Sequence, residues 1–296
     1  MEKLKGALAV FVGAASFGIL STFVKQAYSA GFTLGEVTGV QALLGMLILW
    51  FLYFILGGKK EYKSYTQKSK KWKIMLAGIS TGAVSILYYK SVELVPASIA
   101  IVLLMQFIWI SALINFIIFK QKPSKIETIG IILILASTFL ATGAFEDSFS
   151  DISPLGLLFG LLAATAYAVF IIVNGKIGND HPPVVKSALM VTGACIFIFC
   201  TLQPFSIFDF SKSTSIYQFG LILSVFGTVL PPCLYAYGMP KIGVSLGSIL
   251  SAVELPVAVS LSYFVLAESV SFLQWIGVLL ILLFVVLINS IKKPTL

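Results

Sequence analysis

Glu254 is the residue of this chain whose setting most clearly indicates chemistry. It lies about midway along an apolar run at 243–266, and a charged side chain at the middle of a membrane helix costs about 2.5–3.5 kcal/mol on insertion scales. Acids in such positions almost always face a cavity or a polar partner. Two functions are therefore open: Glu254 binds the amine of a solute, or it takes and releases a proton as its hydration changes. The alternative is a protonated carboxyl that only joins two helices.

Small side chains share the helix face of Glu254. A period of 3.6 residues places Gly247, Ser251 and Ala258 on that face. Because small side chains leave room beside a helix, we expect this face to line a pathway, with Ser251 as a further polar contact for a solute.

Gln106 and Trp109 form a second candidate pair. They are three residues apart in the apolar run at 96–119, so they share a helix face. Gln106 offers donor and acceptor groups, and Trp109 offers a ring face to apolar or cationic groups. The alternatives are an ordinary interhelical hydrogen bond for Gln106 and plain packing for Trp109.

Polar side chains in three further apolar runs complete the candidate set. Tyr88 and Tyr235 carry polar tips on aromatic rings, although tyrosines near a membrane surface are usually interface anchors. Asn174 is a weaker candidate. Pro231 and Pro232 interrupt the run that contains Tyr235 and free backbone carbonyls, and broken helices in carriers often border the substrate site. The predicted solute-binding residues are Glu254, Gln106, Trp109, Tyr88, Tyr235, Ser251 and Asn174.

The elements that must position these residues are membrane helices. Of the 296 residues, 58% are hydrophobic and 11% are charged, and mean hydropathy is +1.02, whereas soluble domains have about 45–50% apolar and roughly 25% charged residues. Ten apolar runs are each long enough to cross a bilayer as a helix. The predicted fold class is therefore an all-α integral membrane protein with ten transmembrane helices. The runs lie at 5–28, 34–57, 72–91, 96–119, 125–145, 154–177, 184–204, 216–238, 243–266 and 272–291.

All 20 basic residues are lysines, and they fall mainly on one side of the predicted helices. With a cytoplasmic N-terminus, 17 of the 20 lie on the cytoplasmic side, and only Lys25, Lys90 and Lys212 lie on the other. The positive-inside rule then predicts a multi-pass protein of the cytoplasmic membrane with both termini in the cytoplasm. The basic loop at 59–73 is expected to touch anionic membrane lipid, and lysines placed this way indicate orientation in the membrane rather than a nucleic-acid partner.

The two halves of the chain resemble each other at a constant spacing. The run at 129–135 recurs 147 positions later at 276–282 as a similar apolar sequence with a glycine as its second residue. This predicts two domains, at 1–147 and 148–296, of five helices each. Because five is odd, the second copy enters from the opposite face, so the repeat is inverted, as in alternating-access carriers. The alternative is a duplication kept for stability alone.

The order of motifs resembles the EamA-domain branch of the drug/metabolite transporter superfamily. The repeat of that family ends in Pro-Val, a long apolar run, Gly-Glu and Gln-x-x-Gly, and the corresponding residues here are Pro256-Val257, Ala267-Glu268 and Gln274-Trp275-Ile276-Gly277. The resemblance covers the whole chain. It implies ten helices in two inverted repeats and the transport of small organic metabolites, usually outward.

Two positions depart from that family. Its first half often has Gly-Glu where this chain has Lys120-Gln121, and an Arg is common near Gln41 in the second helix. No role of that acid or that Arg is therefore carried over. The resemblance leaves the substrate open among amino acids, nucleotide-linked sugars, drugs and other metabolites.

The sequence lacks residues that metalloenzymes and ATP-driven pumps need. It contains one histidine, His181, with no Cys/His cluster for a metal and no Walker A sequence for ATP. We therefore predict no metal, no cofactor and no enzymatic activity. The predicted function is a secondary transporter that moves small organic solutes, amino acids or related compounds, across the cytoplasmic membrane by alternating access, with export favoured.

Several alternatives stay open from the sequence. Protons are one candidate driving ion, with downhill flow as the alternative, and a homodimer is one candidate assembly. A membrane-embedded enzyme acting on lipid substrates would need paired carboxylates or an interfacial histidine, which we do not find. A non-transporting membrane receptor or scaffold is the third alternative, and it predicts no solute flux.

Overall fold

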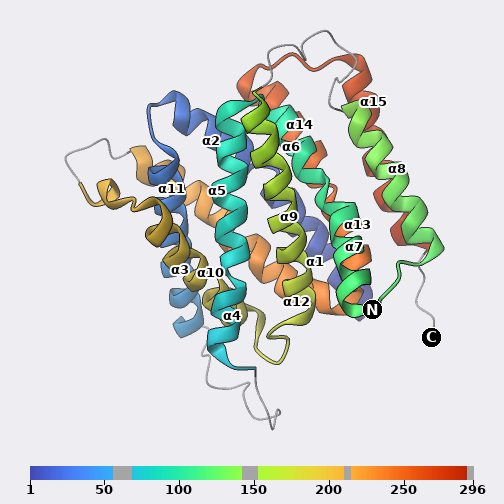
Figure 1. Cartoon of the computed structure of the whole chain (residues 1–296), viewed down its shortest axis with the longest axis horizontal. Helices are drawn as coiled ribbons and strands as arrows, with labels where there is room; N and C mark the ends of the chain where they lie inside the picture. Colours follow the sequence, from blue (N-terminus) through green and yellow to red (C-terminus); the bar gives the residue numbers. More distant parts are fainter. Residues whose placement is uncertain (56–68, 142–152, 210–214, 292–296) are drawn as a thin grey trace.

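The computed structural model describes residues 1–55, 69–141, 153–209 and 215–291, and these residues form helices and connections without any strand. Most of the helices run roughly along one common direction (Figure 1). The predicted domain boundary at 147 and most of the basic loop at 59–73 lie outside the described residues.

The first part of the chain contributes eight helices. Their bounds are α1 (Glu2–Phe17), α2 (Leu20–Ser29), α3 (Leu34–Ile55), α4 (Lys71–Ala77), α5 (Ile79–Leu94), α6 (Ala97–Met105), α7 (Phe107–Phe119) and α8 (Lys125–Ala141). Six of them form three pairs (α1 with α2, α4 with α5, α6 with α7) separated by only one or two residues.

The second part contributes seven α-helices, a 3-10 turn and a π-helical segment. Their bounds are α9 (Pro154–Lys176), α10 (Pro183–Leu202), η2 (Phe205–Phe208), α11 (Ser215–Leu223), η3 (Ser224–Val229, the π-helical segment), α12 (Leu230–Ile242), α13 (Val244–Ser251), α14 (Glu254–Leu266) and α15 (Phe272–Ile291).

Seven helical stretches among the described residues are long and apolar enough to cross a membrane. The other three predicted spans correspond to α4 with α5, to α8 and to α15, which are divided or shorter in apolar length. The ten-span count therefore stays a prediction. The seven stretches are Glu2–Ser29, Leu34–Ile55, Ile99–Phe119, Pro154–Lys176, Pro183–Leu202, Ser215–Ile242 and Val244–Leu266.

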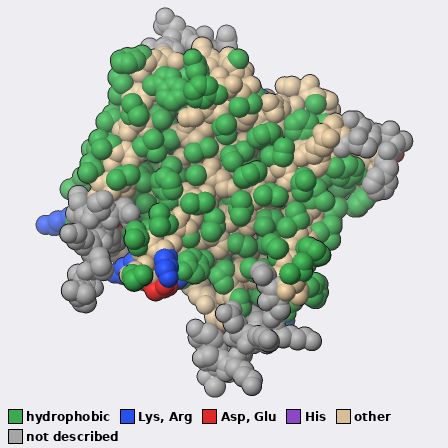
Figure 2. Space-filling view, turned by 180° about the vertical axis from the view of Figure 1, so that it is seen from behind, with side chains coloured by type: hydrophobic (Ala, Val, Ile, Leu, Met, Phe, Trp, Pro, Cys, Tyr) green, Lys and Arg blue, Asp and Glu red, His purple; other side chains and the backbone are tan. Residues whose placement is uncertain are grey.

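The outer surface of the helices suits lipid. Large apolar side chains such as Phe264 and Phe272 are 74% and 82% exposed, which would be costly in water. Figure 2 shows one face covered largely by hydrophobic side chains, with its few charged side chains gathered at the lower left. Several polar side chains, including Gln41, Asn174 and Glu254, are buried instead.

Helix boundaries in the two parts of the chain recur at one spacing. Helices α13, α14 and α15 each begin 147 residues after α6, α7 and α8. Lys120 and Ala267, which end α7 and α14, both have a left-handed backbone with φ of 55° and are also 147 residues apart. A left-handed residue after the last turn stops a helix, so the same stop signal occurs twice.

The same spacing relates two helix starts. At the start of α8, the Glu127 carboxylate accepts the backbone N–H of Ser124 (2.7 Å), and the Ser124 hydroxyl accepts the N–H of Glu127 (3.3 Å). At α15, Gln274 and Ser271 form the same reciprocal pair at 2.7 and 3.3 Å. Each pair is a capping box that satisfies otherwise free N–H groups at a helix N-terminus.

Two glycines allow α10 to cross the break between α4 and α5 at very short range. A Cβ on Gly193 would lie 1.8 Å from the carbonyl oxygen of Met75, and a Cβ on Gly78 would lie 1.8 Å from that of Met190. Small residues at such crossings let membrane helices pack backbone to backbone. Neither backbone can move aside without separating the helices.

We expect Gly193→Ala to lower the free energy of unfolding by about 1–3 kcal/mol or more, because the methyl group meets backbone and cannot be accommodated by a rotamer change. The measurement is the thermal unfolding midpoint of the purified protein in detergent. Gly35→Ala is the matched control, since the nearest atom to a Cβ there is 3.7 Å away. Equal midpoints for Gly193→Ala and the wild type would contradict this packing.

Candidate functional site

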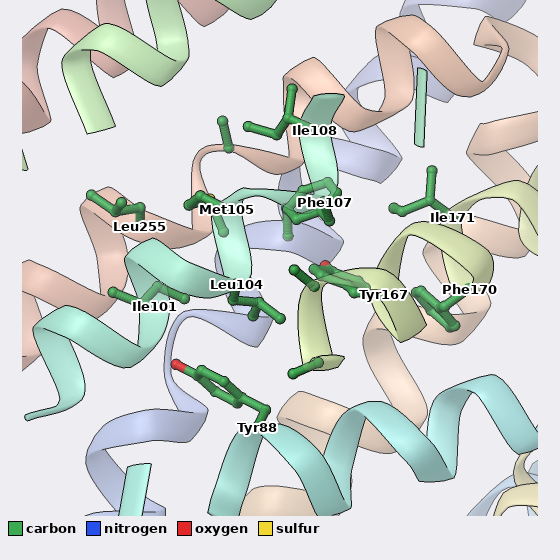
Figure 3. Close-up of a cluster of buried hydrophobic side chains, with 14 of the residues drawn as sticks. Tyr88, Ile101, Leu104, Met105, Phe107, Ile108, Tyr167, Phe170, Ile171 and Leu255 are labelled. Atoms are coloured by element: carbon green, nitrogen blue, oxygen red, sulfur yellow. The ribbon is translucent and has the colours of Figure 1, made fainter. Parts of the chain in front are cut away.

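A cavity lies among the helices and takes its walls from both parts of the chain. Its empty volume is about 480 Å³, part of which is open to the outside. Side chains from α5, α6 and α9 converge there, including Tyr88, Leu104 and Tyr167 (Figure 3). The lining residues are Phe17, Leu20, Gln41, Thr81, Val84, Ser85, Tyr88, Tyr89, Leu104, Tyr167, Phe170, Gly227, Thr228 and Glu254.

Glu254 brings a carboxyl group to this cavity from the centre of a candidate span. It is the first residue of α14 and lies near the middle of the stretch Val244–Leu266. Its side chain is buried, with 3% of the residue exposed, and its Oε2 atom accepts a hydrogen bond from the Tyr167 hydroxyl at 3.0 Å. No lysine among the described residues pairs with it. A helix N-terminus favours a negative charge, but this carboxyl has no neutralising cation.

A chain of hydroxyl groups leads away from Glu254. Tyr167 contacts the Tyr235 hydroxyl at 3.2 Å, and Tyr235 contacts the Ser251 hydroxyl at 2.8 Å. The Ser251 hydroxyl donates to the carbonyl oxygen of Gly247 at 2.9 Å. These residues come from α9, α12 and α13, so the chain joins three helices behind the cavity wall.

The hydrogen atoms in this chain can be counted. Four contacts link Glu254 to the Gly247 carbonyl, but the three hydroxyl groups supply only three hydrogens. With Glu254 ionised, one contact has no hydrogen, and the Tyr167–Tyr235 contact is the longest of the four. A proton on Glu254 would supply the fourth hydrogen and reverse the Tyr167 contact, so that the acid donates to Tyr167 and each hydroxyl donates to the next oxygen along the chain. All four contacts carry a hydrogen only in this protonated arrangement.

Gln41 organises a second polar group on the cavity wall. The Tyr89 hydroxyl donates to its side-chain oxygen at 2.7 Å, and its amide nitrogen donates to the Thr228 hydroxyl at 3.0 Å. The Ser224 hydroxyl donates to the Gln41 carbonyl at 2.8 Å. Thr228 and Ser224 lie in the π-helical segment η3, and such segments occur frequently at functional sites.

Two hydroxyl groups at the cavity have no hydrogen bond. The Tyr88 hydroxyl and the Thr81 hydroxyl are buried and make none with the described residues, and both residues line the cavity. Ser21 lies near Tyr88, but no hydrogen bond of normal geometry joins them. Because buried polar groups are nearly always satisfied, these two hydroxyls are available to a polar group of a bound solute.

Aromatic rings form the apolar part of the site. The Phe17 ring packs edge-on against Tyr167 at 5.8 Å, Phe170 at 6.0 Å and Tyr235 at 5.8 Å between ring centroids. Phe107 packs against Tyr167 at 4.5 Å. The tyrosine that binds Glu254 is thus fixed by rings from α1 and α7.

Four of the seven residues predicted from sequence lie at the cavity or in the hydroxyl chain behind it. Glu254 and Tyr88 line the cavity, and Tyr235 and Ser251 belong to the hydroxyl chain behind Glu254. Asn174 is buried away from the lining, where its amide donates to the carbonyl of Phe170 at 3.0 Å.

Gln106 and Trp109 are not brought to the cavity. The Trp109 indole donates to the Gln106 side-chain oxygen at 3.0 Å, and 41% of Trp109 is exposed on the outer surface. Gln106 occupies the junction of α6 and α7, and its amide donates to the carbonyl of Val102. Their shared face, expected from the spacing of three residues, points away from Glu254's cavity.

Sequence reasoning missed Tyr167, Phe17, Phe170 and the side chains around Gln41 as parts of the site. The signal for Tyr167 was available, because it is a tyrosine inside an apolar run, as Tyr88 and Tyr235 are. Phe17 and Phe170 look like ordinary core residues in sequence, and only packing shows that they enclose a polar group.

Three lysines of the helical segments, Lys25, Lys90 and Lys186, have acceptors away from the cavity. Lys25 of α2 forms an ion pair with Glu268, which follows α14, and Lys90 pairs with Glu93 at 3.0 Å. Lys186 of α10 is buried and donates to the carbonyl of Asn174 and the side-chain oxygen of Asn179, both at 2.8 Å. Each ammonium group therefore has its own acceptors outside the cavity.

The fold and site define a class: a multi-pass helical membrane protein with a partly polar cavity among its helices. The family model for EamA-like transporters matches residues 4–143 and 154–290. The chain belongs to the EamA-like transporter family, and it is a transporter of that family whose partner is a small-molecule solute.

Curated relatives of the chain are transporters as well. It is 22% identical over 286 residues to the uncharacterized transporter YcbK of Bacillus subtilis, covering 93% of this chain and 90% of the relative. It is 25% identical over 239 residues to the threonine/homoserine exporter RhtA of Salmonella typhimurium, covering 80% of this chain and 76% of the relative. One crystal structure matches with a TM-score of 0.73 at 16% identity, covering 99% of this chain and 100% of the other, which shows a shared fold.

We expect the Tyr167–Glu254 contact to appear as a coupling energy. Tyr167→Phe and Glu254→Leu should each change the free energy of unfolding, and the double variant should differ from the sum of the two by about 0.5–3 kcal/mol, as contacting residues do. The measurement is denaturant unfolding in detergent of the four proteins of the cycle.

Tyr28→Phe is the control for that cycle, because its hydroxyl donates to the Tyr89 carbonyl rather than to Glu254. Its effect should add to that of Glu254→Leu within error. Additivity in the Tyr167 cycle would show that the two side chains do not interact.

Proposed function

We propose that the protein is a secondary carrier that moves small organic solutes across the cytoplasmic membrane by alternating access. The observation that carries the proposal is a buried carboxyl group, with no cation beside it, at a cavity whose walls come from both matched segments of the chain. Ionisable groups at such depth mark substrate or ion pathways. The aromatic and hydroxyl lining supplies both apolar and polar contacts for a solute.

The proposal includes ten helices in two inverted five-helix halves, at 1–147 and 148–296. Two family matches of similar length, one in each half, support it. So does the 147-residue spacing of α6, α7 and α8 relative to α13, α14 and α15. The halves exchange conformations in such carriers, which opens the central site first to one side and then to the other.

Helix packing also fits a two-fold relation between the halves. Helix α1 packs against α12, and its counterpart pair, α9 against α5, is packed too. Helices α3 and α10, and likewise α8 and α15, pack against their own counterparts, as elements beside a two-fold axis do.

Orientation and direction complete the proposal. The lysine distribution favours both termini in the cytoplasm. RhtA of Salmonella typhimurium is a threonine/homoserine exporter, which favours export of amino acids or related compounds here. Lipid surrounds the apolar outer face, on which Phe264 and Phe272 are exposed.

Glu254 is the proposed exchange site for a solute amine and a proton. The hydroxyl chain needs one hydrogen from Glu254 to be complete, so the empty site favours the protonated acid. A cationic amine pairs best with the carboxylate. The two ligands therefore exclude each other at one carboxyl group, and a proton moving down its gradient drives the amine in the opposite direction.

We expect Glu254→Gln to abolish the response of transport to an imposed pH gradient, because a carboxamide neither binds nor releases a proton in this range. The measurement is uptake of labelled amino acids and amines into proteoliposomes with and without the gradient. Glu93→Gln is the control, since Glu93 lies at the surface and pairs with Lys90. Full gradient-driven transport by Glu254→Gln would refute the exchange mechanism, and absence of flux in the wild type would refute the carrier.

A further inference from the structure

Among the described residues, the cavity lining has one carboxyl group and no basic side chain. Glu254 is the sole carboxylate among its lining residues, which include no lysine and no histidine, and the chain has no arginine. The lysines within the nearby helices are held by acceptors elsewhere: Lys25 by Glu268, Lys90 by Glu93, and Lys186 by two oxygens near the end of α9. A solute in the cavity therefore meets at most one charge, and that charge is negative.

Backbone N–H groups at two helix breaks near the cavity are engaged within the chain. Broken helices can offer free N–H groups to a substrate carboxylate, but at the α13–α14 junction the N–H groups of Ala252, Val253 and Leu255 are bonded to carbonyls three residues earlier. At the α6–α7 junction the N–H of Gln106 is bonded to the carbonyl of Leu103 at 3.1 Å. These four N–H groups are therefore engaged within tightened turns and are not free to bind an anion.

The aromatic and hydroxyl side chains of the cavity lining favour a solute that has one ammonium group and is otherwise uncharged. Phe17, Tyr167 and Phe170 present aromatic rings beside Glu254, and ring faces attract ammonium groups. The unbonded hydroxyls of Tyr88 and Thr81 suit an uncharged polar group such as a solute hydroxyl. A carboxylate placed here would share the cavity with Glu254 and would have neutral donors at best.

We propose that the cavity selects organic amines that lack a carboxylate over the amino acids of the same carbon skeleton. The inference rests on the proposed carrier function. It narrows the solute class from amino acids or related compounds to the related amines. The ammonium group pairs with Glu254 against the aromatic rings, and the rest of the solute contacts the apolar wall or the hydroxyls of Tyr88 and Thr81. An amino acid makes the same amine contact but leaves its own carboxylate without a cation, which costs a buried charge its solvation.

Two matched pairs of solutes test this selection. Each pair differs only by the carboxyl group: 3-aminopropan-1-ol with homoserine, and isopentylamine with leucine. Binding is measured as thermal stabilisation of the purified full-length protein over a concentration series, and transport as counterflow of the labelled compound in proteoliposomes. We expect each amine to bind roughly tenfold or more tightly than its amino acid, since one unpaired charge is worth at least one such factor.

Two variants, with one control, test whether the preference for amines depends on the charges in the cavity. Glu254→Gln should remove the preference for amines. Thr81→Lys adds a cation at a lining position whose hydroxyl has no partner, and it should shift the preference toward homoserine and leucine. Thr81→Gln is the matched control of similar length, because it removes the same hydroxyl without adding a charge, and Thr81→Lys should favour homoserine and leucine more than Thr81→Gln does.

The binding and counterflow results can refute the selection for amines without refuting the carrier function. Equal or tighter binding of the amino acids by the wild type, together with Glu254-dependent counterflow, would overturn the selection and leave the carrier in place. Counterflow of neither amines nor amino acids would overturn both. An unchanged preference in a correctly folded Thr81→Lys, judged by size-exclusion chromatography, would also overturn the selection.

Discussion

The burial of one carboxyl group at the middle of an apolar span is the constraint around which this protein is organised. Glu254 is held there by a single hydrogen bond from Tyr167, and Tyr167 is in turn fixed by the rings of Phe17 and Phe107. A lone hydrogen bond satisfies a neutral acid far better than a carboxylate, which needs several donors or a cation in a medium of low polarity. The carboxylate therefore stays unsatisfied until a ligand supplies a positive charge, and the proposed exchange mechanism depends on this property.

The side chains around Glu254 come from helices in separate parts of the chain. Glu254 begins α14, Tyr167 lies within α9, and the Gln41 network ties α3 to the π-helical segment η3. Close crossings such as Gly78 and Gly193 hold the outer helices against one another backbone to backbone. This packing surrounds a cavity whose wall contains two unbonded hydroxyls.

The sequence allowed the class of the protein and its most informative residue to be predicted. An acid midway along an apolar run signals a cavity because its burial is costly, and the structure places Glu254 at one. The spacing of 147 residues, visible in the apolar runs, reappears in helix starts and stops. Gln106 and Trp109 show the limit of this reasoning, since a shared helix face does not reveal whether it turns inward or toward lipid. Tyr167 and Phe17 depend on contacts between distant helices, which a single sequence does not contain.

Infrared difference spectroscopy tests directly whether a proton and a solute amine share the Glu254 carboxyl group. We expect the purified protein without solute to show the carbonyl band of a buried protonated acid, and we expect this band to be missing in Glu254→Gln. Adding an amine at constant pH should convert the band to carboxylate bands while protons are released. If the amine binds and the band of the protonated acid stays unchanged, exchange at Glu254 is contradicted, because the proton and the solute would then not share this carboxyl group.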